Sequence, residues 1–384
     1  MTASTLVIVL ACELAARVAL WRSALQQEPE QKVFGFSATG YGDLRPNMSH
    51  VETLYDLRPY FLQTNSVGLR NSEELVEGAF RVLAIGDSFT YGYYVHNQET
   101  WPARLEEVLN QRLTTRVQVL NAGVPGYTIE DELAYLRDKG LALEPDLVIL
   151  GVYTNDIMDM NPRIRQHFAR PVLLAQSAPV AETITPLEAF LQNHTALYSL
   201  LVSARGAYRQ QQIEAAVNRV TPTIEGLREL YLNLTFLQPD APEYRTEWEA
   251  YERLLRETAA LLEDAGIPFV IVMFPDLAQM PEEGGLPEVP QQRLGQMADE
   301  MGTPFLDLLP VFRGAGDIQS LYLMYYSDSA PVDPNAPDAA VMMYTGDGHP
   351  SPYGHLVAAR AAAQLLAEQK LTPFDEQASR SGPG

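Results

Sequence analysis

The chain has 384 residues, of which 46% are hydrophobic and 20% are charged, and these proportions are typical of a folded globular protein rather than of a disordered or multi-span membrane protein. Its formal net charge of −22 disfavours nucleic acid as a partner, because affinity for nucleic acid comes largely from basic patches that neutralise phosphates. The single cysteine, Cys12, excludes an intrachain disulfide and a cysteine-based zinc site.

Residues 1–29 form an N-terminal hydrophobic or amphipathic segment. Its apolar run at residues 6–12 ends at Glu13 and Arg17 and is too short to span a bilayer, which takes about 20 apolar residues in a helix. Two interpretations stay open. As a truncated signal anchor, the segment would attach an extracytoplasmic protein to a membrane; as an amphipathic terminal helix, it would suit a cytoplasmic protein.

Residues 30–79 are mixed and polar. Turn signals at residues 41–43 and 65–68 predict loops with short strands, which we expect to pack on the core as a leader region. From residue 80 the pattern changes, because a short apolar run at residues 82–85 is followed by a turn and then by a segment with helical spacing.

The unit of strand, turn and helix then recurs along the chain. Buried strands are predicted at residues 82–85, 117–120, 146–152, 268–274 and 305–308, and helices at residues 101–113, 129–142, 244–265 and 352–369. Strands that alternate with helices indicate a parallel sheet with helices on both faces. We therefore expect a doubly wound three-layer α/β/α sandwich of about five strands over residues 80–370, followed by a flexible C-terminal tail at residues 371–384.

One interval is too long for a single crossover helix. Residues 157–243 lie between the third and fourth strands and contain helical stretches near residues 186–206 and 208–233. An insertion of this size at the carboxyl ends of the strands would cover a binding site, so we interpret it as a helical cap. Residues 275–300 and 328–345 carry Pro, Gly and Asp and are predicted to be loops.

Residues suited to catalysis follow the first two strands. Ser88, after Asp87, is in the turn that ends the first strand and lies at the carboxyl edge of the sheet, where ligands bind in such folds. The simpler alternative is that Asp87 or Ser88 caps the next helix. After the second strand, Gly123 and Gly126 would let the backbone approach a ligand and point an N–H at it, or would form a turn with no further role.

Two more groups complete the candidate site. Asn155 follows the third strand and is able to donate its amide to an oxyanion, with Asp156 in support; the alternative is a helix cap. Near the end of the chain, Asp347 and His349 flank Gly348 and offer a base with an acid to orient it. Each group alone is explained at least as well by ordinary structure, and the prediction rests on their occurrence together.

These motifs resemble the blocks of the SGNH hydrolase family, also called the GDSL-like esterases: Gly86-Asp87-Ser88, Gly126 in Asn-Ala-Gly-Val-Pro-Gly, Asn155-Asp156, and Asp347 with His349. The resemblance implies a flavodoxin-like sandwich in which Ser88 is the nucleophile, His349 the base and Asp347 the orienting acid. It also implies an oxyanion hole formed by the backbone N–H groups of Ser88 and Gly126 and by the side chain of Asn155. No metal or organic cofactor is implied.

Two positions depart from the family pattern. The family usually places its acid three residues before the histidine. This chain has Gly346 at that position, and Asp347 is only two residues before His349. A Ser88–His349 dyad with a backbone acceptor therefore stays open. The third block commonly has glycine two residues before the asparagine, where this chain has Tyr153, and we expect this ring to narrow the acyl pocket.

The leader segment Asn65-Ser66-Val67-Gly68-Leu69-Arg70 also resembles one found in bacterial, often membrane-anchored, members of the family. The resemblance implies a serine esterase that hydrolyses a short acyl ester, with an acetyl group on a carbohydrate as the expected substrate. Two alternatives stay open. One is an O-acyltransferase that moves an acyl group to a glycan hydroxyl, and the other is a non-catalytic glycan-binding or scaffold protein on the same fold.

Overall fold

The computed structural model describes residues 12–13, 15, 34–36, 42–52, 60–161, 224–323 and 348–373. By its contacts the chain divides into two compact units, Met1–Asp43 with Gln166–Leu227, and Leu44–Arg165 with Arg228–Gly384. Several expectations fall outside the described residues, namely those for most of residues 1–29, for residues 162–223 of the cap predicted at residues 157–243, for the loop at residues 328–345 and for the tail from residue 374. Within the described residues, no helix combines the length and apolar character that a membrane span requires.

The second unit contains a parallel sheet, to which the described residues contribute five strands: β5 (Phe80–Gly86), β6 (Val117–Gly123), β7 (Leu147–Val152), β8 (Phe269–Met273) and β9 (Phe305–Asp307). Their spatial order is β6-β5-β7-β8-β9, and every neighbouring pair is parallel. The flavodoxin-like prediction is therefore confirmed. In this order the switch point lies between β5 and β7, and ligands bind beyond the carboxyl ends of the strands there.

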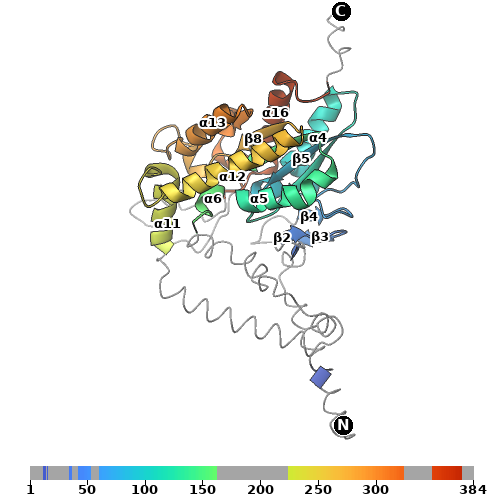
Figure 1. Ribbon diagram of the computed structural model, residues 1–384, viewed down its shortest axis with the longest axis horizontal. Helices are drawn as coiled ribbons and strands as arrows, with labels where there is room; N and C mark the ends of the chain where they lie inside the picture. Colours follow the sequence, from blue (N-terminus) through green and yellow to red (C-terminus); the bar gives the residue numbers. More distant parts are fainter. Residues whose placement is uncertain are drawn as a thin grey trace, which may run out of the picture. The chain divides into compact units, whose positions relative to one another are not determined.

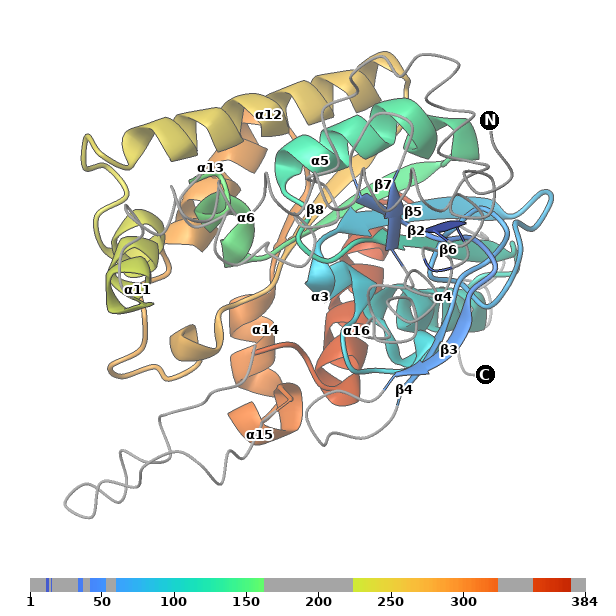
Figure 2. The same ribbon diagram turned by 90° about the horizontal axis from the view of Figure 1, so that it is seen from below.

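Helices cover both faces of this sheet (Figure 1, Figure 2). On one face lie α4 (Trp101–Arg112), α14 (Leu308–Ala315) and α16 (Pro352–Glu368), and on the other lie α5 (Ile129–Tyr135), α12 (Arg245–Asp264) and α13 (Val289–Met301). Strands β6, β7 and β8 are buried along their whole length, as expected for strands covered on both faces. Side chains of β5 alternate between the two layers, and Val82 and Ala84 pack with Trp101 of α4.

Two segments differ from the sequence-based expectation. The prediction of loops at residues 275–300 is wrong from residue 289, where α13 begins, with Pro290 in its first turn and Gly302 as a left-handed C-cap. The prolines of this segment favour a loop in the sequence, but proline is also favoured in the first turn of a helix, which is where Pro290 lies. Leu308, expected at the end of the fifth strand, instead begins α14, because Asp307 caps that helix by accepting the Leu309 N–H at 2.9 Å.

The remaining elements are short. They are the leader strands β1 (Phe34–Phe36), β2 (Gly42–Leu44), β3 (Ser49–Glu52) and β4 (Tyr60–Gln63), the helices α3 (Ser88–Tyr91), α6 (Thr154–Met158), α11 (Ile224–Leu232) and α15 (Ile318–Leu321), and single turns at Asn97–Glu99, Leu136–Gly140, Leu141–Leu143, Asn233–Leu237 and Leu277–Gln279. In the helix predicted at residues 129–142, only α5 is α-helical. It is followed by a π-helical turn at Leu136–Gly140 and a 3₁₀ turn at Leu141–Leu143. Strands β3 and β4 pair antiparallel.

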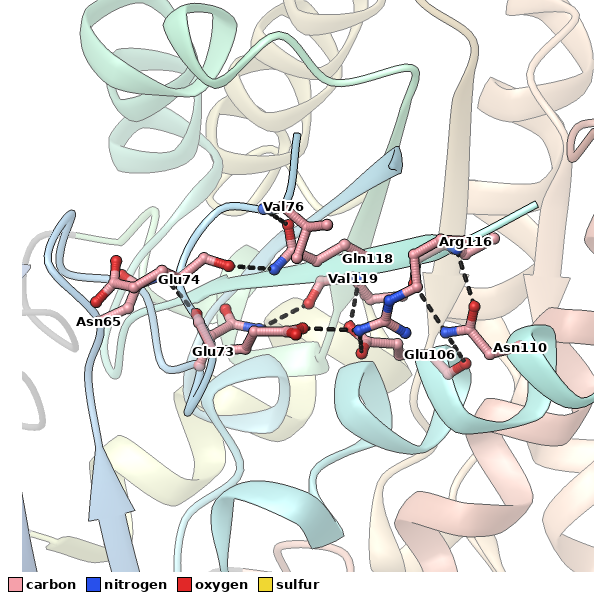
Figure 3. Close-up of polar contacts among 11 residues, drawn as sticks. Asn65, Glu73, Glu74, Val76, Glu106, Asn110, Arg116, Gln118 and Val119 are labelled. Carbon is pink, nitrogen blue, oxygen red and sulfur yellow. Dashed lines mark hydrogen bonds and ion pairs between the residues drawn. The ribbon is translucent and has the colours of Figure 1, made fainter. Parts of the chain in front are cut away.

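Strand β6 is at the edge of the sheet, and side chains satisfy its outer backbone groups (Figure 3). The Val119 N–H donates to Glu106 at 2.8 Å, and the Asn110 amide exchanges hydrogen bonds with Val117 at 2.8 and 2.9 Å. Arg116 forms an ion pair with the same Glu106 at 2.9 Å. An exposed strand edge is a template for pairing with other chains, and these contacts cover it.

Candidate active site

The nucleophile candidate lies at the turn from β5 into α3. Asp87 is the N-cap of α3, and its carboxylate accepts the Phe89 N–H at 2.8 Å. Ser88 is the first helical residue, so its N–H is among the first four of the helix, which have no acceptor within the helix. The side chain of Ser88 is buried apart from 8% of its surface. This turn therefore presents a hydroxyl and a backbone donor at the same point.

Three glycines let α3 sit directly on the ends of the strands. Gly86 is in register with both Gly123 and Gly151. A Cβ atom on Gly123 would lie 2.1 Å from the Tyr91 nitrogen, and one on either of the other two would lie 2.3 Å from the Thr90 hydroxyl oxygen. Gly123 was singled out from the sequence for close approach to a ligand, whereas the element that approaches it in the structure is α3.

His349 reaches Ser88 from the far end of the chain. Its Nε2 atom is 2.8 Å from the Ser88 Oγ atom, across 261 positions of sequence. The preceding Gly348 has φ +65°, a left-handed conformation that glycine adopts without steric cost. Two backbone hydrogen bonds hold the loop around His349 beside α15. The Leu323 N–H donates to the His349 carbonyl and the Ser351 N–H donates to the Leu321 carbonyl, both at 2.8 Å.

Aromatic rings surround the imidazole. The rings of Phe89, Tyr93 and Tyr94 have their centroids 4.8, 5.3 and 5.7 Å from that of His349, and both tyrosines meet it nearly edge-on. Tyr153 in turn stacks on Phe89, with the two ring centroids 3.8 Å apart and an interplanar angle of 19°. These contacts restrict the imidazole to a narrow range of orientations.

Asn155 is linked to the turn that carries Ser88 by a hydrogen bond to the Asp87 carboxylate. It lies in α6, just after β7, and its side chain hydrogen-bonds to Asp87. The Ser88 Oγ atom is 3.4 Å from the Oδ2 atom of the same carboxylate. Asp156 accepts the Tyr153 N–H at 3.0 Å and so caps α6, which means that the capping alternative holds for Asp156. Asn155 is consequently held beside Ser88.

The glycine of the second block lies at the same edge of the sheet. Gly126 has φ +78° and follows β6, whose end is adjacent to that of β5. The Val124 N–H donates to the Gly86 carbonyl at 3.0 Å, which ties this loop to the turn that carries Ser88. Asp347 lies outside the described residues, so its role as the orienting acid stays a prediction.

Tyr153 is held by a polar group that sequence reasoning missed. Its hydroxyl donates to the Asp276 carboxylate at 3.0 Å, and the Tyr231 hydroxyl donates to the same oxygen at 2.5 Å. Burial, together with the negative charge of Asp276, raises the pKa of Tyr153 well above its usual value, so the phenol stays protonated as a donor. Asp276 follows β8 in a segment interpreted as a loop, and no local motif marks it.

Three buried carboxyl groups lie beneath the site. Burial raises the pKa values of Asp87, Glu132 and Asp156, and their mutual repulsion raises those of Glu132 and Asp156 further. Glu132 escaped sequence analysis because it follows Glu130 and Asp131 at the start of α5, where acidic residues are explained by the helix dipole. In the part of the chain that the structure describes, no three His, Cys, Asp or Glu side chains form a group that would hold a metal ion.

A protein family and several solved structures are similar to this chain. Residues 84–357 match the model of the GDSL-like lipase/acylhydrolase family, and no curated protein matches the chain. Among solved structures, a lipolytic protein of the G-D-S-L family from Desulfitobacterium hafniense is 16% identical, covering 75% of this chain and 99% of its own, with a TM-score of 0.37. An acetylxylan esterase from Geobacillus stearothermophilus is 17% identical over 75% of this chain and 95% of its own, with a TM-score of 0.39.

These structural similarities are too low to identify a substrate, whereas the family model covers more than half of the chain and includes both Ser88 and His349. The chain belongs to the GDSL-like lipase/acylhydrolase family and is a carboxylic ester hydrolase.

Proposed function

We propose that the protein is a serine esterase that hydrolyses a short acyl ester, an acetyl group on a carbohydrate, through an acyl-enzyme on Ser88. The observation that carries the proposal is the 2.8 Å separation of the His349 Nε2 and Ser88 Oγ atoms. A serine hydroxyl is a weak nucleophile until a base lies within about 2.6–3.2 Å of it. This pair satisfies that condition although its members are remote in sequence.

In the proposed reaction, Nε2 of His349 accepts the Ser88 proton as Oγ bonds to the ester carbonyl carbon. The carbonyl oxygen becomes the tetrahedral oxyanion, which receives hydrogen bonds from the N–H groups of Ser88 and Gly126 and from the Asn155 amide; one such donor is worth about 3 kcal/mol. Collapse of the intermediate expels the alcohol, which takes the proton from His349. Water, deprotonated by His349, then releases the acid and restores Ser88.

Three residues have supporting roles in this proposal. Asp347 orients the imidazole of His349, as the family resemblance implies. Asp87 holds the Asn155 side chain by the hydrogen bond between the two side chains. Asp156 fixes the start of α6, the helix that carries Asn155.

The preference for a short acyl group is supported by the aromatic residues. Phe89, Tyr93 and Tyr94 crowd His349, and Tyr153 is anchored to Asp276 rather than free to swing aside. A large acyl chain would have to displace packed rings. Tyr93 and Tyr153 are both partly exposed, and such rings suit stacking on a sugar, whose C–H groups present an apolar face.

The test compares p-nitrophenyl acetate, butyrate and octanoate as substrates, together with acetate release from an acetylated oligosaccharide. We expect kcat/KM to fall with chain length, and Ser88→Ala to lower kcat by at least about 10³-fold. Ser66→Ala, which removes an exposed hydroxyl bonded to Glu74, serves as the control and should match the parent.

Three outcomes would overturn parts of the proposal. Equal rates for Ser88→Ala and the parent would eliminate serine catalysis. A preference for octanoate would eliminate the short acyl group. Acetyl transfer to an added glycan that exceeds release of free acetate would replace hydrolysis by O-acyl transfer.

A further inference from the structure

Arg70, from the leader region, is buried beside the nucleophile turn with 1% of its surface exposed. Its guanidinium group donates to the backbone carbonyls of Tyr91 at 2.6 Å, Gly92 at 2.5 Å and Val95 at 2.6 Å. Its Nε atom donates to the Asn97 side chain at 3.3 Å. The planar, five-donor geometry of arginine suits such divergent acceptors, which a lysine ammonium does not match.

The carbonyls that Arg70 binds belong to the end of α3. Tyr91 is the last residue of this helix, and Gly92 is its C-cap with φ +86°. The last carbonyls of a helix have no donor within the helix, and Arg70 supplies one to each of these two. The guanidinium carbon also lies 4.3 Å from the centroid of the Tyr91 ring, a cation–π contact. Arg70 therefore secures one end of the helix whose other end is Ser88.

The same loop continues to the general-base candidate. Tyr93 and Tyr94, between the carbonyls that Arg70 binds, are the two tyrosines that meet the His349 ring edge-on. Tyr94 has φ +63°, a left-handed conformation that a bulky residue adopts only when its surroundings impose it. The three carbonyl contacts of Arg70 bracket this residue. They thus constrain the rings that pack on His349 as well as the helix that carries Ser88.

Other contacts join residues 61–70 of the leader to this turn. Gln63 of β4 exchanges two hydrogen bonds with the Asn97 side chain, at 2.7 and 3.0 Å, and the Phe61 N–H donates to His96 at 2.8 Å. The Arg70 backbone N–H donates to the Asn121 carbonyl of β6 at 2.9 Å. This part of the leader is consequently bound both to the loop after α3 and to the sheet.

We propose that Arg70 is a positioning residue for catalysis, which holds the 91–95 loop so that Ser88 Oγ and His349 Nε2 stay in bonding range. It acts through the backbone and the tyrosine rings and does not contact the substrate. This inference rests on the proposed roles of Ser88 and His349. By this inference the leader region, which precedes the first core strand, contributes to catalysis by positioning the catalytic groups.

The test measures kcat and KM of Arg70→Ala and Arg70→Lys with p-nitrophenyl acetate, at a temperature where circular dichroism shows each variant to be folded. A displacement of about 1 Å in a catalytic group costs about 10²-fold, so we expect kcat of Arg70→Ala to fall by about that factor with KM changed less than about threefold. Arg70→Lys should also lose kcat, because an ammonium group reaches fewer of the four acceptors. Millimolar guanidinium chloride should restore part of the lost kcat to Arg70→Ala.

Arg81→Ala is the matched control. Arg81 also donates to backbone carbonyls, those of Leu143 and Val76, at 3.0 and 3.4 Å, but it lies at the amino end of β5. We expect its kcat to match the parent and not to respond to guanidinium. The proposal is overturned if folded Arg70→Ala or Arg70→Lys retains the parental kcat, or if Arg81→Ala loses as much. If Ser88→Ala is as active as the parent, the proposed function fails first, whatever the Arg70 variants do.

Discussion

Asp87 shows how a single residue serves both the fold and the site. Its carboxylate caps α3 through the Phe89 N–H and also accepts a hydrogen bond from Asn155, while the Ser88 Oγ atom lies 3.4 Å from its Oδ2 atom. Burial raises the pKa of Asp87, while these hydrogen bonds and the nearby His349 oppose the rise. The cap and the site, which the sequence presents as alternatives, are therefore compatible, because the two carboxylate oxygens accept from different donors.

Glu132 provides a test at the residue scale. Burial, then repulsion by Asp87 and Asp131, raises its pKa well above the ordinary value of 4.5. At pH values above the ordinary pKa and below the raised one, Glu132 keeps its proton in the folded protein and loses it in the unfolded chain. The free energy of unfolding therefore falls as pH rises through this range. Glu132→Gln cannot ionise and escapes this loss. We expect its stability advantage over the parent to grow by up to about 1.4 kcal/mol for each pH unit in that range.

Urea unfolding of both proteins at several pH values above 5 or so measures this difference. Glu249→Gln is the control for the same substitution at an exposed position, since Glu249 is exposed on α12. A Glu132→Gln protein whose advantage is absent or shrinks as pH rises would show that the carboxyl is ionised in the folded state.

At the scale of elements, the four-residue helix α3 owes its position to the glycines beneath it and to the contacts at its two ends. Gly123→Ala would place a Cβ atom 2.1 Å from the Tyr91 nitrogen and 2.6 Å from the Thr90 carbonyl carbon. Both are backbone atoms and cannot rotate away. The helix must shift, and Ser88 with it.

We therefore expect Gly123→Ala to lower kcat toward p-nitrophenyl acetate by about 10²-fold and to reduce the free energy of unfolding by about 1–3 kcal/mol. Gly314→Ala is the matched control, because Gly314 lies within α14 with no atom near its added Cβ; it should keep full activity and gain up to about 1 kcal/mol. Parental kcat in a folded Gly123→Ala protein would contradict this account of α3.

At the scale of the whole molecule, the sheet was predictable because buried parallel strands appear as continuous apolar runs, such as residues 147–152. The proposed site residues Ser88 and Asn155 were predictable because each follows a strand at the carboxyl edge of the sheet, and His349 because an acid, Asp347, lies close enough in sequence to orient it. Arg70 and Asp276 were not, because their contacts join segments remote in sequence. Helix α13 was missed because a proline marks both loops and helix starts, and only its packing distinguishes the two.

The most direct measurement of the central claim is the site of covalent modification by a serine-directed fluorophosphonate, mapped by peptide mass spectrometry. The reagent bonds to an activated hydroxyl and loses fluoride. We expect one adduct per chain on the peptide that contains Ser88, none with Ser88→Ala, and much slower formation with His349→Ala. Full labelling of Ser88→Ala, or labelling of His349→Ala at the parental rate, would contradict the pairing of this hydroxyl with this imidazole.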